Sequence, residues 1–207
     1  MDPTLVMALR SPVASLLLVV TVAVSLLGLY KLPQLIERNL FRPYWLTRRQ
    51  QWATLVTSGF IHADVPHLLF NGFTFYAFAF GLERAIGSSS FLVLYTFGLL
   101  ASSAGTWLQH RSEPGYASLG ASGAISAVLF ASIVYFPSAS LFIMPIPVPI
   151  PAPIFAVAYL AYSHWAARHQ PGGINHDAHL WGALSGLAYV ALTDASAYGR
   201  AIQQFMG

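Results

Sequence analysis

Long apolar runs without charge alternate with shorter polar segments along most of this chain. The runs predict six membrane-spanning helices, at residues 13–30, 67–82, 91–108, 122–136, 154–167 and 178–192. A helix needs about 20 apolar residues to cross a hydrocarbon core about 30 Å thick. The first run exceeds the core of a signal peptide, about 7–15 residues, and no small-x-small cleavage site follows it. We therefore predict an all-α membrane protein with six transmembrane helices, formed by one domain over residues 1–207.

Two connecting segments have a distinctive composition. Residues 31–66 mix cationic with aromatic side chains: Lys31, Arg38, Arg42, Tyr44, Trp45, Arg48, Arg49 and Trp52. Such mixtures favour the headgroup layer of a membrane, so we predict a long interfacial first loop with short helical pieces. In residues 145–153 every second residue is proline. A chain that lacks alternate N–H groups cannot form a helix, which predicts an extended connector.

The fourth run is too short to cross the membrane alone. At a rise of about 1.5 Å per residue it covers about 22 Å of a core about 30 Å thick. The polar loop before it must therefore enter the membrane depth, where irregular backbone persists only inside protein or beside a water-filled cavity. We predict a water-filled pocket above Ser122.

Composition supports the membrane assignment and excludes several kinds of chemistry. Hydrophobic residues make up 56% of the chain and charged residues 8%, whereas soluble domains carry about 25% charged residues. The net charge of +3 is too small and too scattered to indicate a nucleic-acid partner. Cysteine is absent, which excludes disulfides, thiolate metal sites and a cysteine nucleophile.

The segment Gly120-Ala121-Ser122-Gly123 follows a polar loop and opens the fourth run. Backbone N–H groups at the start of a helix are unpaired, and the helix dipole favours negative charge there. This suits a serine nucleophile whose reaction passes through an oxyanion. The alternative is that these small residues form an ordinary contact between membrane helices.

The candidate base is His179, near the start of the sixth run. Ionisable groups inside membrane spans are costly and usually functional. Gly182 and Gly186 follow it and make a flat surface for helix contact. The fourth run has a matching face of small residues: Ser122, Ser126 and Ala127. If the two faces pack, Ser122 and His179 come level and the imidazole can activate the hydroxyl. Alternatively, His179 is a packed histidine bonded to a carbonyl.

His67 and Asn71 lie four residues apart at the top of the second run. This spacing places both side chains on one face of a helix. They can donate hydrogen bonds to an oxyanion, in addition to the Ser122 backbone N–H. The alternative is a polar contact that holds two helices together.

Together these segments resemble the rhomboid intramembrane serine proteases. The resemblance rests on Gly120 to Gly123, on His179-Leu180-Trp181-Gly182 with Gly186, and on His67-Leu68-Leu69-Phe70-Asn71, in that family's order along the spans. Glu83-Arg84-x-x-Gly87-Ser88 is also similar. The resemblance covers residues 52–190, most of the chain.

The resemblance implies a six-helix core and a Ser122–His179 dyad without a third carboxylate. Ser122 would attack a peptide bond in the membrane helix of a substrate protein, with His67, Asn71 and the Ser122 N–H holding the oxyanion. The fifth span and residues 168–177 would act as gate and cap. No cofactor or metal is implied, and the expected partners are transmembrane substrates and the lipid bilayer. The expected location is the bacterial inner membrane, as a multi-pass protein.

Two residues depart from the family pattern. Trp52-Ala53 stands where members often have Trp-Arg, and Ser126 stands where a tyrosine commonly stacks on the catalytic histidine. The second departure predicts a less firmly braced His179 ring. Asp177 is expected to cap the sixth helix, since residues two apart on a helix do not face each other. Solvated or interfacial roles are expected for the remaining histidines: His62, His110, His164, His169 and His176.

Two other functions compete with proteolysis. The first is an inactive rhomboid-like module that binds membrane helices, and the second is a small transporter with a histidine proton relay. The predicted spans contain no acidic residue except Glu83 at a boundary, which disfavours the transporter. The orientation is in conflict: with the family's cytoplasmic N-terminus, most of the Lys and Arg residues fall on the opposite side, whereas the positive-inside rule favours the reverse.

Overall fold

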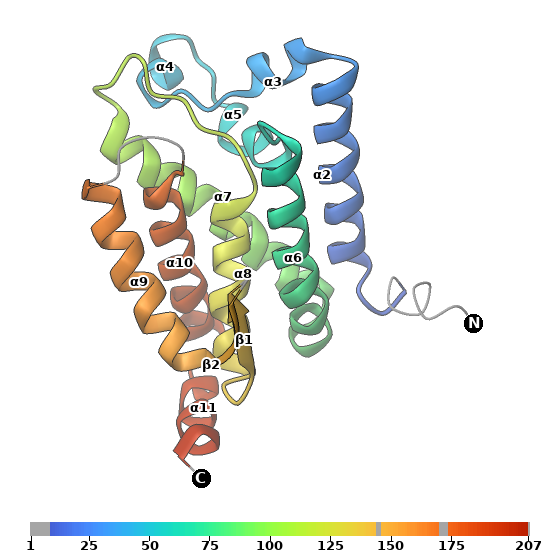
Figure 1. The fold of residues 1–207 in the computed structure, drawn as a ribbon, viewed down its shortest axis with the longest axis vertical. Helices are drawn as coiled ribbons and strands as arrows, with labels where there is room; N and C mark the ends of the chain where they lie inside the picture. The colour runs from blue at the N-terminus through green and yellow to red at the C-terminus, as the bar shows by residue number, and fades with distance from the viewer. Residues whose placement is uncertain (1–8, 144–145, 170–173, 207) are drawn as a thin grey trace.

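The computed structural model describes residues 9–143, 146–169 and 174–206, which are helical almost throughout (Figure 1). The long helices are α2 (Pro12–Tyr30), α6 (Val65–Ile86), α7 (Ser88–His110), α8 (Ser122–Tyr135), α9 (Ala152–His169) and α10 (His176–Thr193). The shorter ones are α3 (Pro33–Asn39), α4 (Pro43–Arg48), α5 (Thr54–Thr57), the 3-10 helix η1 (Ser58–Phe60) and α11 (Ser196–Met206). Each predicted run thus forms a helix, with ends shifted by a few residues.

Three described helices are long and apolar enough to cross a membrane, namely α2, α6 and α7, and α8 is a shorter apolar helix. Helices α9 and α10 have 18 residues each and more polar sequences. The chain is therefore a helical membrane protein. The count of six spans and the interfacial position of the first loop stay predictions.

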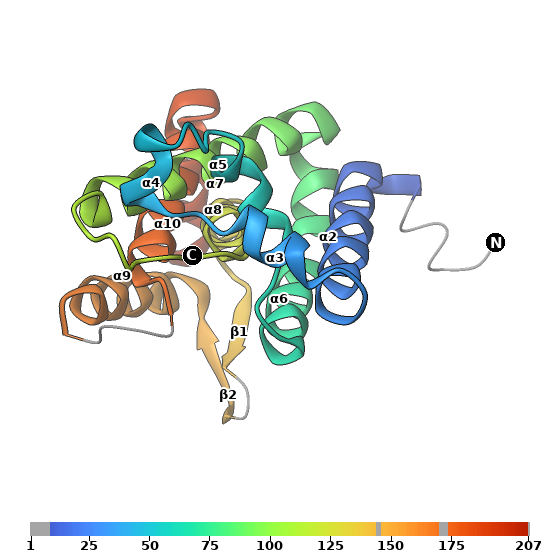
Figure 2. The same cartoon turned by 90° about the horizontal axis from the view of Figure 1, so that it is seen from above.

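Helix α8 lies at the centre of the molecule, as the view from above shows (Figure 2). Every residue from Gly123 to Val134 is buried. The main neighbours are α6, α7 and α10, and α9 and α11 make smaller contacts. Many of the buried residues are Gly, Ala or Ser, whose small side chains let surrounding helices approach closely. A helix with no outward face explains why apolar residues occur on all its sides.

Helices α8 and α10 touch backbone to backbone. A Cβ atom added to Gly182 would lie 2.1 Å from the Gly123 carbonyl oxygen, and one added to Gly186 would lie 2.2 Å from that of Ala127. Both glycines must therefore lack a side chain. Because the contacts advance by four residues on each helix, the helices run in the same direction. The predicted contact of Gly182 and Gly186 with small residues of this helix is confirmed at Ala127, whereas Gly123 takes the place expected for Ser122 and Ser126.

Glu83 joins the starts of α2 and α7 to the end of α6. Its carboxylate is 1% exposed and accepts hydrogen bonds from the backbone N–H groups of Val13 (3.1 Å) and Ala14 (2.7 Å) and from the Ser88 hydroxyl (2.6 Å). Ser11 adds a bond to the Phe80 carbonyl at 3.0 Å. Unpaired N–H groups at the start of α2 thus receive a buried charged acceptor, which also suits the positive end of the helix dipole.

The proline-rich tract is extended as far as Pro151, as predicted, and it also forms an unexpected hairpin, whereas Pro153 already belongs to α9. Strand β1 (Ser140–Ile143) pairs antiparallel with β2 (Ile146–Pro151), with Ser140 opposite Pro151 and Phe142 opposite Pro149. Residues two apart on a strand point their N–H groups to the same side. Prolines at alternate positions therefore occupy one edge and leave the other able to pair. The first residue of the tract, Pro145, lies outside the described residues.

Replacing Glu83 with alanine would leave two buried N–H groups of α2 without their acceptor. We expect Glu83→Ala to lose about 2–3 kcal/mol of unfolding free energy, the range for a hydrogen bond to a charged group. Glu83→Gln keeps one carbonyl oxygen and should lose less. Unfolding in detergent micelles measures both, with the exposed Glu37→Gln as a control that changes stability by less than about 1 kcal/mol. Wild-type stability in Glu83→Ala would contradict this role.

Candidate active site

Ser122 is the first residue of α8, where the chain turns from a loop into the buried helix. The preceding Ala121 offers no side-chain cap, so the first N–H groups of α8 are free to meet another acceptor. Gly120 has a φ of +115°, a conformation that side chains rarely allow, and its N–H donates to the Ser58 carbonyl at 2.9 Å. The helix start is thus fixed against η1.

His67 and Asn71 lie against this same turn. A Cβ atom on Gly120 would lie 2.7 Å from His67 Cε1, 2.9 Å from His67 Nε2 and 3.7 Å from Asn71 Nδ2. The backbone conformation therefore favours glycine at position 120, and a side chain there would also push the His67 ring aside. The structure thus places both candidate oxyanion donors of α6 against Gly120, which precedes Ser122 by two residues.

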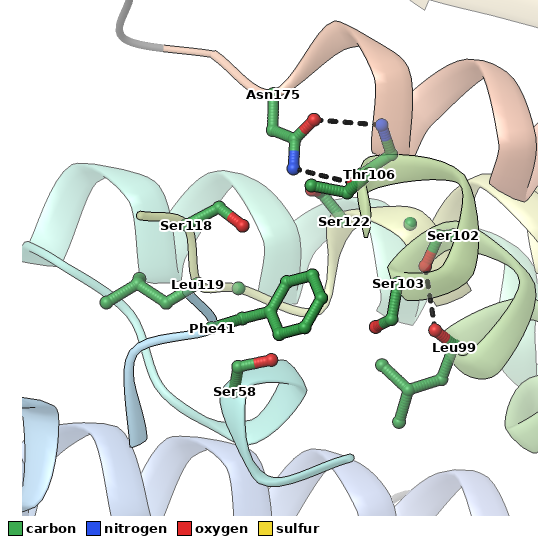
Figure 3. A pocket seen from close by; sticks show the side chains of 13 residues that line it. Phe41, Ser58, Leu99, Ser102, Ser103, Thr106, Ser118, Leu119, Ser122 and Asn175 are labelled. Carbon is green, nitrogen blue, oxygen red and sulfur yellow. Dashed lines mark hydrogen bonds between the residues drawn. The ribbon is translucent and has the colours of Figure 1, made fainter. Parts of the chain in front are cut away.

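A small polar pocket opens at Ser122 (Figure 3). Most of its lining side chains are hydroxyl or amide groups: Ser58, Ser102, Ser103, Thr106, Ser118, Ser122 and Asn175. Its volume of about 20 Å³ has room for one water molecule, which needs several polar partners. A narrow pocket is therefore present at Ser122, whereas its filling by water stays a prediction.

His179 lies in the first turn of α10, less than one helical turn from the level of Ser122. That level follows from the Gly123–Gly182 contact, which sets the two helices in register. The imidazole packs on the Tyr159 ring of α9, with centroids 6.4 Å apart, and on His176 at 6.0 Å. The described residues show no direct hydrogen bond between the Ser122 hydroxyl and the His179 ring. The structure thus brings the two candidates onto touching helices without joining them.

His62 is a site residue that the sequence analysis missed. A solvated or interfacial role was expected, but this is wrong: His62 is 0% exposed. Its Nε2 lies 2.8 Å from Asn71 Nδ2, its Nδ1 lies 3.0 Å from the Ser25 hydroxyl, and its ring packs edge-on to His67 at 4.8 Å. The only available signal was its place after Phe60 and Ile61, in a segment that leads into a membrane helix.

The hydrogen bonds around His62 form a directional chain. The Asn71 amide nitrogen can only donate, so His62 Nε2 accepts and Nδ1 carries the proton. Nδ1–H then donates to the Ser25 oxygen, and the Ser25 hydroxyl donates to the Phe60 carbonyl at 3.2 Å. Burial, assisted by nearby His67, lowers the pKa of His62 from 6.5 to about 4. The neutral ring therefore fixes the Asn71 side chain at physiological pH.

Asn175, and not Asp177, caps α10. The Asn175 Oδ1 accepts from the Ala178 N–H at 2.9 Å, and its Nδ2 donates to Thr106 at 3.1 Å. The expected cap, Asp177, lies inside the first turn and pairs with His110 Nε2 at 3.0 Å. A cap must precede the helix, and α10 begins earlier than predicted. The Asn175–Thr106 and Asp177–His110 bonds hold the start of α10 on the end of α7. The loop at residues 168–177 was predicted to act as a cap over the active site, and its residues 170–173 lie outside the described residues.

Acid should weaken the fold through His62. The unfolded chain binds a proton on this ring below pH 6.5, whereas the folded protein resists protonation until about pH 4. Stability is therefore complete above pH 6.5 and falls as the pH drops through that window, by up to about 3 kcal/mol from this group. His62→Gln should show a shallower loss when unfolding in micelles is followed from pH 7 to 4. The exposed His164→Gln should keep the wild-type slope, and equal slopes in all three would contradict the assignment.

Comparison with known proteins gives one consistent result. The Rhomboid domain family matches residues 49–195. Rhomboid protein 1, mitochondrial, of Saccharomyces cerevisiae is 30% identical over 178 residues, covering 80% of this chain and 49% of the relative. The Putative rhomboid protease YdcA of Bacillus subtilis is 40% identical over 75 residues, covering 36% and 37%.

RHOMBOID-like protein 12, mitochondrial, of Arabidopsis thaliana is 31% identical over 112 residues, covering 45% of this chain and 33% of the relative. The chain thus spans half or less of the length of these curated relatives. The family match, in contrast, covers most of the chain and includes Ser122, His179, His67 and Asn71. With the helical membrane fold and the α8–α10 contact described above, it establishes that this chain belongs to the rhomboid family.

Proposed function

We propose that this protein is an intramembrane serine endopeptidase that cleaves transmembrane segments of other membrane proteins with a Ser122–His179 dyad. The observation that carries the proposal is the backbone contact of Gly123 with Gly182. It sets the starts of α8 and α10 side by side, and with them the one serine and the one histidine that the reaction needs.

In the reaction, Ser122 Oγ attacks the carbonyl carbon of the scissile peptide bond while the His179 imidazole takes the hydroxyl proton. The tetrahedral intermediate collapses when His179 gives that proton to the departing amine. A water then attacks the resulting ester, again with His179 as base, and releases the carboxylate product and the serine. In free enzymes such hydrogen bonds are often long and tighten when substrate binds, which fits the unjoined dyad.

The oxyanion is held by donors from two helices. The Ser122 N–H belongs to the uncapped first turn of α8, and the His67 and Asn71 side chains lie against Gly120. One amide hydrogen of Asn71 is used by His62, which leaves the second for the oxyanion. Donors that are already fixed need not reorganise when negative charge develops on the oxyanion. The hydrogen bonds of His62 to Asn71 and Ser25 hold the Asn71 amide in this way.

The polar pocket beside Ser122 supports the hydrolytic half of the reaction. Water must reach the ester at a depth where lipid would exclude it. A pocket lined by hydroxyl groups and an amide gives one water a set of hydrogen-bond partners.

The bundle of six spans, with α9 and the loop after it as gate and cap, is part of this proposal. The bacterial inner membrane finds no support in the relatives' names, because the yeast, Arabidopsis and Danio rerio proteins are named as mitochondrial. The proposal therefore specifies a multi-pass membrane protein without naming the membrane.

One observation favours the second candidate, an inactive module that binds membrane helices. The Ser122 hydroxyl and the His179 ring are not hydrogen-bonded in the described residues. Against this candidate, glycine at 120, 182 and 186, where a side chain would clash, keeps the reactive groups close. Labelling with a serine-directed fluorophosphonate separates the two, because an inactive module leaves Ser122 unlabelled.

Loss of either dyad member should abolish cleavage. For Ser122→Ala and His179→Ala we expect kcat on a model transmembrane substrate to fall by at least about 10³-fold, and Ser122→Ala should also lose fluorophosphonate labelling. Ser132→Ala, another buried serine of α8, and His164→Ala, an exposed histidine of α9, are matched controls that keep wild-type rates. Normal cleavage by either dyad variant would refute the mechanism.

Removing the Asn71 amide should slow the reaction without preventing substrate binding. Asn71→Ala loses one oxyanion donor, which costs about 10²-fold in kcat, whereas KM should change little. Initial rates over a range of substrate mole fractions in proteoliposomes measure both constants. Asn39→Ala, which removes an amide bonded only to the Leu35 carbonyl of α3, serves as the control. A wild-type kcat in Asn71→Ala would assign the oxyanion to other donors.

A further inference from the structure

A tyrosine ring packs on His179 although position 126 does not supply one. The serine at position 126 predicted a poorly braced imidazole, since a serine cannot stack. In the structure Tyr159 of α9 faces the His179 ring, with an interplanar angle of 24° and centroids 6.4 Å apart. Offset stacking of aromatic rings occurs within about 4.5–7 Å. Helix α9 thus supplies the ring that position 126 lacks, which corrects the expectation of a less firmly braced His179 ring.

Tyr159 is itself fixed by three contacts. Its hydroxyl lies 3.2 Å from the Ser126 hydroxyl. Its ring packs on Phe130 of α8, with centroids 5.4 Å apart, and on Phe155 of its own helix at 5.5 Å. A tyrosine needs a partner for its O–H group when it is buried among apolar side chains, and Ser126 provides one. The plane of the Tyr159 ring is thus set by α8.

Ser126 connects this tyrosine to the nucleophile. It follows Ser122 by four residues, so the two serines lie on the same face of α8, one turn apart. A small residue at 126 leaves the space into which the α9 tyrosine reaches. One turn of α8 therefore carries Ser122, and the next turn anchors the ring against which His179 lies.

The helix that supplies Tyr159 lies at the edge of the molecule, next to α10, in both views (Figures 1 and 2). Its buried residues are Ala152, Ser163 and Ala166, whereas Ile154 and Val157 are 56% and 71% exposed. The inner face of α9 thus buries small residues and packs the half-buried side chains of Phe155, Tyr159 and Leu160 on a cluster that includes residues of α8 and α10. The bracing ring is held near His179 only while this outer helix is docked.

From these contacts we infer that Tyr159 is a positioning residue for His179, with its ring stacked on the imidazole and its hydroxyl anchored on Ser126. The inference rests on the proposed function, because it concerns the orientation of the base. It also makes the reactivity of Ser122 depend on α9. If α9 moved away, His179 would lose its stacking partner.

Variants of Tyr159 separate the ring from the hydroxyl. Tyr159→Leu removes both, and we expect kcat to fall about tenfold or more, a part of the 10²–10⁴-fold that a positioned base contributes, with KM within about twofold. Tyr159→Phe keeps the ring and should lose no more than about threefold in kcat. Trp165→Leu removes an aromatic side chain of the same helix that packs on His169, and should keep the wild-type kcat.

Rescue tests positioning directly. In the double variant Ser126→Tyr with Tyr159→Leu, a tyrosine on α8 takes the place of the one lost from α9. We expect it to recover most of the lost kcat, which a general loss of folding would not allow. A double variant no faster than Tyr159→Leu would contradict the positioning role.

A measurement without catalysis tests the contact itself. Proton resonances of the His179 ring, assigned in histidine-labelled protein by their loss in His179→Ala, should shift in Tyr159→Leu because the ring current of Tyr159 disappears. They should not move in Trp165→Leu. Unchanged resonances in Tyr159→Leu would overturn the inference whether or not the protein cleaves. If the resonances shift in Tyr159→Leu but kcat stays at the wild-type value, the contact exists and the positioning role is overturned. If the wild-type protein neither cleaves substrate nor reacts with the fluorophosphonate, the proposed function is overturned, and with it the role of the Tyr159–His179 contact in catalysis.

Discussion

The close approach of α8 and α10 determines how the rest of the molecule is arranged. Two glycines of α10 rest on the backbone of α8, and any side chain there would collide with a carbonyl oxygen. Inside a membrane, helices gain little from the hydrophobic effect when they associate, so tight van der Waals contact between small residues supplies the attraction. Because the contact repeats after four residues on each helix, it fixes distance, direction and register together. As a result, Ser122 and His179 lie within one helical turn of the same level on two touching helices.

Polar groups hold the remaining helices to this pair. Glu83 binds the N–H groups that open α2, Asn175 ties the start of α10 to α7, and the His62 chain links α2 to Asn71. In an apolar surrounding, each such bond is hard to replace, since no water competes for the donor or acceptor. The polar residues that look out of place in an apolar sequence are the ones that set the positions of the helices.

The sequence predicted what depends on local pattern. The helices follow from runs of apolar residues, and the α8–α10 contact follows from the spacing of Gly182 and Gly186 against small residues of the fourth run. Contacts between distant segments were not predicted. The burial of His62 depends on Ser25 and Asn71, the hairpin depends on which edge the prolines occupy, and the ring beside His179 comes from Tyr159. None of these pairings leaves a periodic signal, because each joins residues whose separation in the chain is arbitrary.

The complete burial of α8 also bears on how the protein enters its membrane. A helix of 14 residues is about 21 Å long, so lipid on all sides would leave its polar ends inside a hydrocarbon core about 30 Å thick. Such a helix is not stable by itself in the lipid. Helix α10, whose glycines contact the backbone of α8, is synthesised later, after the β1–β2 hairpin and α9. The packing of the helix that begins at Ser122 is therefore complete only when the ribosome has synthesised α10.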